Sequence, residues 1–112
     1  MRIRSIKPEF WRSADIDPMD SQAFKEFGTA PPGREFLYRL HSETGELLYV
    51  GITWNPFVRW RVHKREKPWW GEVARADVYL CLDDRDARDW ETWCIKALDP
   101  KYNKHQKRGW KP

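Results

Sequence analysis

The sequence predicts one small α+β domain. Two short apolar runs joined by a glycine-containing turn indicate a hairpin, two amphipathic patterns indicate helices, and an alternating run indicates a further strand. A chain of 112 residues has the length of a single domain with a single core. Because it contains 8 Trp, 4 Tyr and 5 Phe, aromatic side chains should fill much of that core.

The hairpin is predicted from residues 36–40 and 47–51, which are joined by a turn that contains Gly45. Glycine tolerates the positive φ angles that tight hairpin turns require. Tyr38 and Tyr49 lie on the two strands, so we expect them to face each other across the pair.

A first helix is predicted from Asn55 and Pro56 to about Arg65. Asparagine caps free amide groups, and proline fits the first helical position. Side chains four residues apart share one stripe of a helix. We expect Val58 and Val62 to form a stripe that faces the sheet. Arg59 and His63 should form the adjacent stripe, from which both can meet one substrate.

The alternating run 76–82 predicts the third strand. A second helix should begin at a cap formed by Asp83 or Asp84 and run through Leu98, because Pro100 follows. The helices and strands therefore alternate along the chain after the hairpin.

Glu91 is expected inside the apolar stripe of that second helix, whose members are Ala87, Trp90, Cys94 and Leu98. A buried carboxylate must be compensated, since an isolated buried charge costs several kcal/mol. Two partners remain open at this point, an arginine such as Arg59 in a plain ion pair, or a metal ion.

The formal net charge of +4 arises from 21 basic and 17 acidic residues, and the excess lies in residues 36–112. An anionic partner is indicated, most simply DNA. The alternative is a solvated basic helix face followed by a basic tail, residues 105–112. The candidate DNA-binding residues are Arg61, Lys64, Arg65, Lys67, Lys101, Lys104, Lys107 and Arg108.

The sequence disfavours a membrane protein, a zinc site and a structural disulfide. No run approaches the roughly 20 apolar residues that span a bilayer, so we expect no membrane partner and a cytoplasmic location. Cys81 and Cys94 lack CxxC spacing, and no histidine lies at a zinc-ligand interval from them. We therefore expect no zinc site and no structural disulfide.

Residues 1–35 are predicted to form an N-terminal arm that ends in a linker rich in proline and glycine. Its apolar side chains are expected to pack onto the main domain, in preference to an independent activity: Ile3, Ile6, Phe10 and Trp11. The opening run resembles the first residues of replication-initiation or helix-turn-helix proteins of bacteriophages, which hints at a phage origin.

The chain from residue 36 to about 104 resembles the GIY-YIG nuclease family. The sequence Phe-Leu-Tyr at 36–38 stands where the family has Gly-Ile-Tyr, and Tyr-Val-Gly at 49–51 stands where it has Tyr-Ile-Gly. The chain departs from the family motifs at two positions: Phe36 replaces glycine, and Val50 replaces isoleucine. Six polar positions match in order: Tyr38, Tyr49, Arg59, His63, Glu91 and Asn103.

The resemblance implies a small three-stranded antiparallel sheet flanked by helices, with a nuclease domain over residues 36–104. It also implies hydrolysis of DNA phosphodiester bonds with Mg²⁺, or Mn²⁺ as a substitute, held by Glu91. Arg59 would neutralise charge on the phosphoryl group.

Tyr38 would activate water, and His63 could relay its proton. A free tyrosine is ionised in only about one molecule in a thousand at neutral pH, so Arg59 and the metal are expected to favour the phenolate. Tyr49 would orient water or phosphate, and Asn103 would contact backbone or phosphate.

The two resemblances together imply a DNA endonuclease of a phage or mobile element, acting in the cytoplasm of a bacterial host. A second copy of the chain or a separate recognition protein would be a further partner, since so small a domain recognises little sequence alone. The main alternative is a DNA-binding module of the same fold that does not cut, such as a phage regulator or replication accessory. The third hypothesis is a protein-interaction domain with an aromatic surface.

Overall fold

The structure is a computed structural model that describes residues 6–103 of the chain. Its elements in chain order are β1 (Glu9–Asp15), the 3₁₀ helix η1 (Ser21–Phe27), β2 (Glu35–Ser42), β3 (Leu47–Thr53), α1 (Pro56–Glu66), the 3₁₀ helix η2 (Trp70–Glu72), β4 (Val73–Cys81) and α2 (Asp84–Leu98). Within this range no helix has both the length and the apolar character of a membrane span. The α+β class predicted from the sequence is confirmed.

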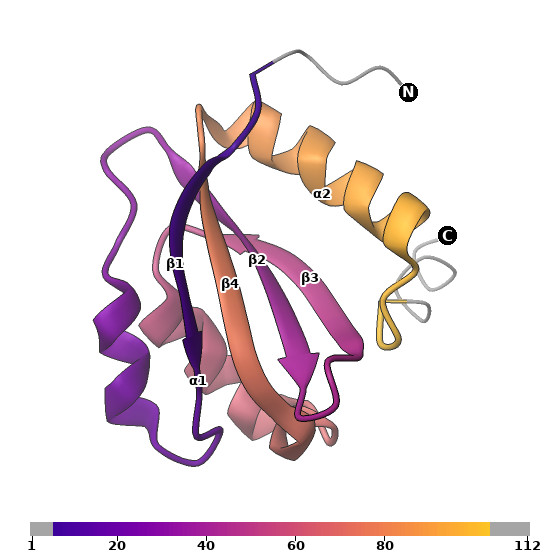
Figure 1. Cartoon of the computed structure of the whole chain (residues 1–112). Coiled ribbons are helices and arrows are strands. Elements are labelled where there is room, and N and C mark those ends of the chain that lie inside the picture. Colours follow the sequence, from indigo (N-terminus) through magenta and orange to yellow (C-terminus); the bar gives the residue numbers. More distant parts are fainter. Residues whose placement is uncertain (1–5, 104–112) are drawn as a thin grey trace.

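The sheet has four antiparallel strands in the order β1-β4-β2-β3 (Figure 1), so the expectation of three strands is wrong. The additional strand, β1, comes from the segment expected to be an arm. It pairs with β4 from Glu9 opposite Leu80 to Asp15 opposite Arg75. Because β1 is a largely exposed edge strand, its sequence mixes charged and apolar residues and has no clean alternation.

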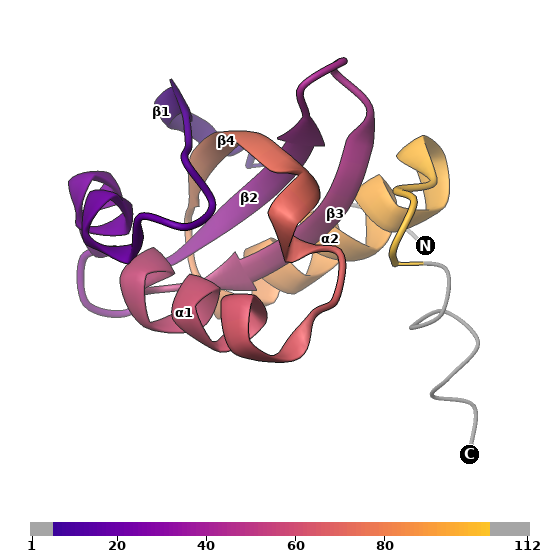
Figure 2. The same cartoon turned by 90° about the horizontal axis from the view of Figure 1, so that it is seen from below.

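The elements form layers around the sheet. η1 lies beside α1 (Figure 2), and both pack on the face that carries Phe36 and Leu40. α2 packs on the opposite face over Leu37 and Val50 (Figure 1). The larger core lies on the α1 side and is mostly aromatic.

The start of each α-helix is capped as the sequence predicts. The Asn55 side chain accepts a hydrogen bond from Val58 N, and Asp83 accepts one from Asp86 N. Gly45 has a φ of 88°, as the hairpin turn requires.

The buried face of α1 differs from the prediction. Val58 is 51% exposed, whereas Trp60 is 0% exposed and packs against Phe24, Phe27 and Tyr38. Burial of an indole removes more apolar surface from water than burial of a valine, so the helix turns its tryptophan inward.

Cys81 and Cys94 are buried free thiols in the small apolar cluster beneath α2. Burial, with lesser contributions from neighbouring charges, raises the pKa of Cys81 to about 12. Such a thiol is chemically inert at neutral pH, so it serves as an apolar packing residue.

Candidate active site

The two tyrosines share the face of the sheet that α1 covers. Tyr38 lies opposite Gly51, and Tyr49 lies opposite Leu40, so the tyrosines are diagonal neighbours and not directly opposed. Their ring centroids are 6.3 Å apart, and both side chains are buried. The strand pairing therefore brings two phenols from different sequence motifs together.

Gly51 makes room for the Tyr38 ring. A Cβ atom at this position would lie 2.5 Å from Tyr38 Oη and 2.6 Å from Tyr38 Cζ. Contacts this short do not occur in folded proteins, so the Tyr38 hydroxyl can lie over β3 only if residue 51 is glycine. The glycine is thus a requirement of the phenol position as well as of the sequence motif.

We expect Gly51→Ala to lower the free energy of unfolding by about 1–3 kcal/mol, because the methyl group must displace a buried ring. Urea denaturation measures this change. Gly71→Ala is the matched control, since a Cβ there meets nothing within 4 Å. If the two variants were equally stable, the close approach of Tyr38 to β3 would be refuted.

The Tyr38 hydroxyl and His63 Nε2 form a buried hydrogen bond of 2.8 Å. Burial, together with the charges of Arg59 and Lys67, lowers the pKa of His63 to about 3, so the imidazole is neutral at neutral pH. Burial raises the pKa of Tyr38 well above 10, and the opposing influence of Arg59 is smaller. Tyr38 is therefore a neutral phenol in the free protein, although the charge of Arg59 acts in the expected direction and lowers its pKa.

The Tyr38 oxygen has Arg59 as a further partner. Arg59 acts on the Tyr38 oxygen through its charge and its side-chain N–H groups, and a guanidinium can only donate. A hydroxyl oxygen can accept two hydrogen bonds, so the donor of the 2.8 Å bond is Tyr38 Oη or His63 Nε2, according to which ring nitrogen carries the proton. Nδ1 makes no hydrogen bond with residues 6–103.

His63 should make stability depend on pH. Its pKa is 6.5 when unfolded and about 3 when folded, so the unfolded state binds the extra proton between these values. The free energy of unfolding should therefore fall as the pH drops through this window, by about 1.4 kcal/mol per pH unit from this group. His63→Gln removes the titration and keeps an acceptor for Tyr38.

Denaturant titrations of both proteins across this window measure the difference, because other groups titrate in both and cancel. We expect the free energy of unfolding of His63→Gln to depend less steeply on pH than that of the wild type. Parallel curves would mean that His63 is not buried as a neutral imidazole.

Arg59 and Glu91 act on the same two phenols. The charge of Arg59 lowers the pKa of Tyr38 and Tyr49, and that of Glu91 raises both, although burial has the larger influence. Arg59 is on α1 and Glu91 is on α2, so the two helices contribute charges from opposite sides of the edge strand β3. Two phenols, an imidazole, a guanidinium and a carboxylate thus belong to one electrostatically coupled group.

Glu91 is half-buried, in line with its predicted place on the apolar stripe of α2. Burial raises the pKa of its carboxyl group, and the charges of Arg88 and Arg59 oppose this rise. Among residues 6–103 it forms no ion pair within 4.0 Å, so the plain ion pair with Arg59 is not formed. A carboxylate in this setting would gain from a cation.

Glu91 is the carboxylate among the six predicted catalytic residues. The described part of the chain holds no group of three or more His, Cys, Asp or Glu side chains that could bind a metal ion. Mg²⁺ commonly takes one or two protein carboxylates and completes its octahedron with water and phosphate oxygens. Glu91 would then be the protein ligand.

Asn103 holds the backbone of β3. Its Oδ1 accepts from Val50 N at 2.8 Å, and its Nδ2 donates to Val50 O at 3.1 Å. Tyr102 N also donates to Leu48 O. Of the two contacts expected for Asn103, backbone and phosphate, the structure has the backbone contact, which fixes the strand residue directly after Tyr49.

Tryptophans that the sequence motifs do not include enclose the site. Trp69 packs 5.2 Å from the ring of Tyr49 and stacks at 5.0 Å on Tyr102, and Trp70 lies 6.0 Å from His63. This wall keeps His63 from water and thereby lowers its pKa. In the sequence, the adjacent pair Trp69 and Trp70 was the signal that could have indicated this wall, but the sequence alone does not reveal which residues they contact.

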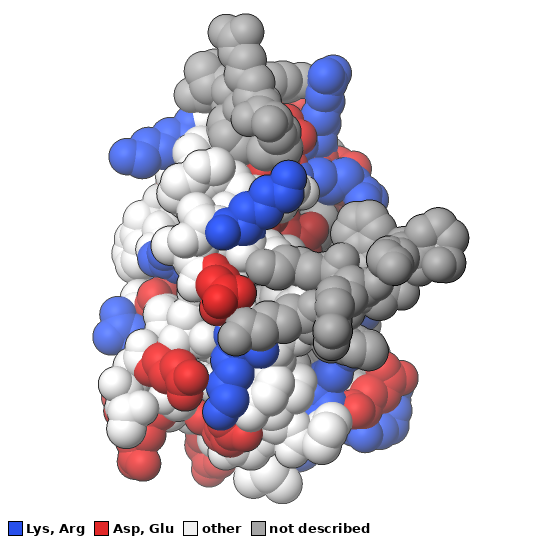
Figure 3. Space-filling model, turned by 90° about the vertical axis from the view of Figure 1, so that its right-hand side faces the viewer, with Lys and Arg blue, Asp and Glu red and all other residues white. Residues whose placement is uncertain are grey.

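Two of the predicted DNA-binding lysines already have partners. Lys64 Nζ donates to Ser21 Oγ at 3.2 Å, and Lys101 Nζ lies 3.8 Å from Glu72 and 4.0 Å from Glu46. On the face seen in Figure 3, Lys and Arg side chains lie among Asp and Glu side chains. That face therefore carries mixed charge.

The other predicted DNA-binding residues that the structure describes lie on or next to α1. Arg61 is exposed above the Phe57 ring, Arg65 is exposed, and Lys67 is half-buried. They share a helix with Arg59 and are the best placed to meet a phosphate backbone. Three further predicted DNA-binding residues lie outside the described residues: Lys104, Lys107 and Arg108.

Comparison of the chain with protein-family models, with curated proteins and with solved structures finds no match. Function must therefore be argued from the residues and their arrangement.

Proposed function

We propose that this protein is a metal-dependent DNA endonuclease of the GIY-YIG type, which hydrolyses phosphodiester bonds and serves a bacteriophage or mobile element in a bacterial cytoplasm. The observation that carries the proposal is the coupled group described above. The Tyr38 and Tyr49 ring centroids lie 6.3 Å apart, Tyr38 Oη and His63 Nε2 share a hydrogen bond of 2.8 Å, and the charges of Arg59 and Glu91 act on both phenols. These side chains come from two strands and two helices and are the ones that the family motifs contain.

The residues have complementary chemical roles. Arg59 lies beside the phenols and would neutralise negative charge that develops on the phosphoryl group. In the complex with DNA, the charges of Arg59 and Mg²⁺ would favour the Tyr38 phenolate, whose oxygen would accept a proton from the attacking water, and the neutral His63 would hold the phenol oxygen by its hydrogen bond. Because burial raises the pKa of Tyr38, the phenolate so formed would be a strong base. Mg²⁺ held by Glu91 would polarise the scissile phosphate and stabilise the leaving oxygen.

Tyr49 and Asn103 have supporting roles. Tyr49 is held against Trp69 and the Tyr38 ring, so its hydroxyl has a defined position from which to orient water or phosphate. Asn103 keeps the backbone next to Tyr49 in place. Sequence recognition would come from a second copy of the chain or from a partner protein, because one small domain offers few base contacts.

The test is incubation of the full chain with supercoiled plasmid DNA and Mg²⁺, with EDTA and Mn²⁺ in parallel reactions. Nicked or linear DNA that appears with either metal and not with EDTA supports the proposal. Retarded DNA without product would instead support the non-cutting DNA-binding module. Neither product nor retardation would reject both.

A further inference from the structure

A pocket of about 180 Å³ lies on the other face of the sheet from the phenols. Side chains alternate along β2, so Leu37 and Arg39 point away from the face that carries Tyr38. We call it the open-face pocket; its lining comes from the N-terminal segment, the sheet and α2, and includes Lys7, Leu37, Arg39, Tyr79, Trp90 and Trp93. No described residue that lines it is acidic.

Aromatic rings at this pocket are unusually exposed. Trp93 is 43% exposed and meets Trp90 edge to face at 5.9 Å. Phe10 on β1 is 64% exposed and meets Tyr79 edge to face at 6.0 Å. Large aromatic side chains in solvent, close to one another, are typical of a binding surface.

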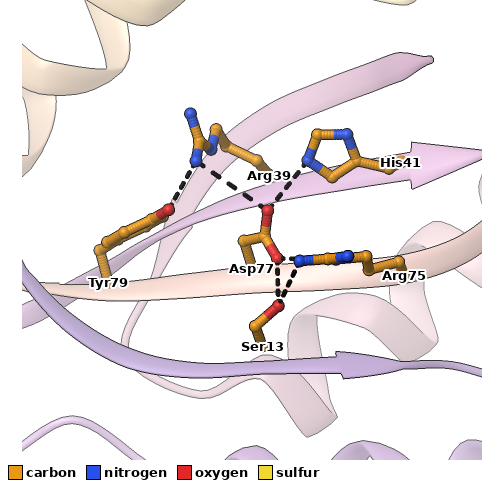
Figure 4. A network of polar contacts seen from close by, with 6 residues as sticks. All are labelled: Ser13, Arg39, His41, Arg75, Asp77 and Tyr79. Carbon is orange, nitrogen blue, oxygen red and sulfur yellow. Dashed lines mark hydrogen bonds and ion pairs between the residues drawn. The ribbon is translucent and has the colours of Figure 1, made fainter. Parts of the chain in front are cut away.

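Arg39 joins this aromatic group to a cluster of polar residues (Figure 4). Its guanidinium lies 5.0 Å from the Tyr79 ring centroid and donates to Tyr79 Oη at 2.5 Å. The Arg39 Nε–H group is buried and makes no hydrogen bond with any described residue. A buried N–H without an acceptor is costly, so a ligand oxygen there would be favourable.

The charge of the cluster is positive. Asp77 is its carboxylate, with Arg39 at 3.9 Å and Arg75 at 3.1 Å. Although burial raises the pKa of Asp77, hydrogen bonds from Ser13 and Arg75 hold it below its usual value, so it stays ionised. Two guanidinium groups thus share one carboxylate, and Lys7 adds a further positive charge at the pocket.

We propose that the open-face pocket binds single-stranded nucleic acid, with an unpaired base against Trp93 and Tyr79 and the adjoining phosphate near Arg39 and Lys7. Aromatic platforms lined by cations bind single strands because every base has a π-face and every nucleotide carries a negative charge. A duplex hides its base faces, and the pocket has room for about one base. This binding does not depend on the proposed cleavage reaction.

The experiment measures fluorescence anisotropy of a labelled single-stranded oligonucleotide of about 12 nucleotides, within the site sizes of single-strand-binding domains. The full chain is used with EDTA, so that cleavage does not interfere. Trp93→Ala should weaken binding by about five- to a hundredfold, as for loss of one stacked base. Trp54→Ala is the matched control, because Trp54 is also an exposed tryptophan but does not line this pocket.

Two further measurements keep the test decisive. An abasic oligonucleotide of the same length should bind more weakly than the normal one, since it keeps the phosphates and lacks the bases. In the wild-type protein, the indole N–H resonance of Trp93 should shift when oligonucleotide is added, and that of the buried Trp60 should not. This second readout holds even if Trp93→Ala fails to fold.

Unchanged affinity of Trp93→Ala, equal affinity for the abasic strand or an unmoved Trp93 resonance would overturn the proposal. Glu91→Gln should bind the oligonucleotide as the wild type does. Failure of the cleavage reaction and failure of this binding site are therefore separate outcomes.

Discussion

Glu91→Gln is expected to reduce metal-dependent plasmid cleavage by about a thousandfold or more, because several kcal/mol of transition-state stabilisation would be lost with the metal ligand. The amide has the shape of the carboxylate but no charge, and it binds Mg²⁺ poorly. Initial rates of plasmid nicking at saturating Mg²⁺ give the comparison.

The same substitution should leave the fold intact. Burial raises the pKa of Glu91, which means that the folded protein disfavours its charge. Removal of that charge should leave the thermal midpoint unchanged or slightly raised at neutral pH. Glu66→Gln, an exposed position at the end of α1, serves as the control for activity. Cleavage by Glu91→Gln at the rate of Glu66→Gln would rule out Glu91 as the metal ligand.

Trp60→Ala is expected to lower the free energy of unfolding by about 3–5 kcal/mol, the range for removal of a fully buried aromatic side chain. Trp60 is 0% exposed and meets Phe24, Phe27 and Tyr38 edge to face, so its loss leaves a cavity between α1, η1 and the sheet. Urea denaturation monitored by circular dichroism measures the change.

Trp54→Ala is the matched comparison, because Trp54 is 56% exposed and should change stability by no more than about 0.5 kcal/mol. A similar loss in both variants would contradict the assignment of Trp60 to the core. Trp60→Phe should recover part of the loss, since it refills part of the cavity.

Local signals in the sequence were sufficient for the hairpin and both helices. The caps Asn55 and Asp83 and the turn at Gly45 act through nearby backbone groups, so a short stretch of sequence contains the whole cause. β1 could not be predicted in this way. Its position depends on hydrogen bonds to β4, whose paired residues lie 60 to 71 positions later in the chain, and its own sequence has no strong alternation.

In the candidate site, too, some features could be predicted from the sequence and others depend on contacts between distant residues. Sequence order identified side chains that the structure brings together, such as Tyr38 and His63. Their protonation was not predictable, because the shift of the His63 pKa comes from burial by an aromatic wall distant in sequence. The ion pairs of Lys101 were likewise invisible, since Glu46 and Glu72 approach it only after folding.

The central position of β4 has a consequence for the synthesis of this protein. β4 lies between β1 and β2, yet it is the last strand to leave the ribosome. Until then β1 has no neighbour, and β2 pairs with β3 alone. The sheet must therefore assemble late and through distant pairings, which form slowly because a long loop has to close first. A nascent chain that stalls before Val73 would lack the strand that joins β1 to the β2–β3 hairpin.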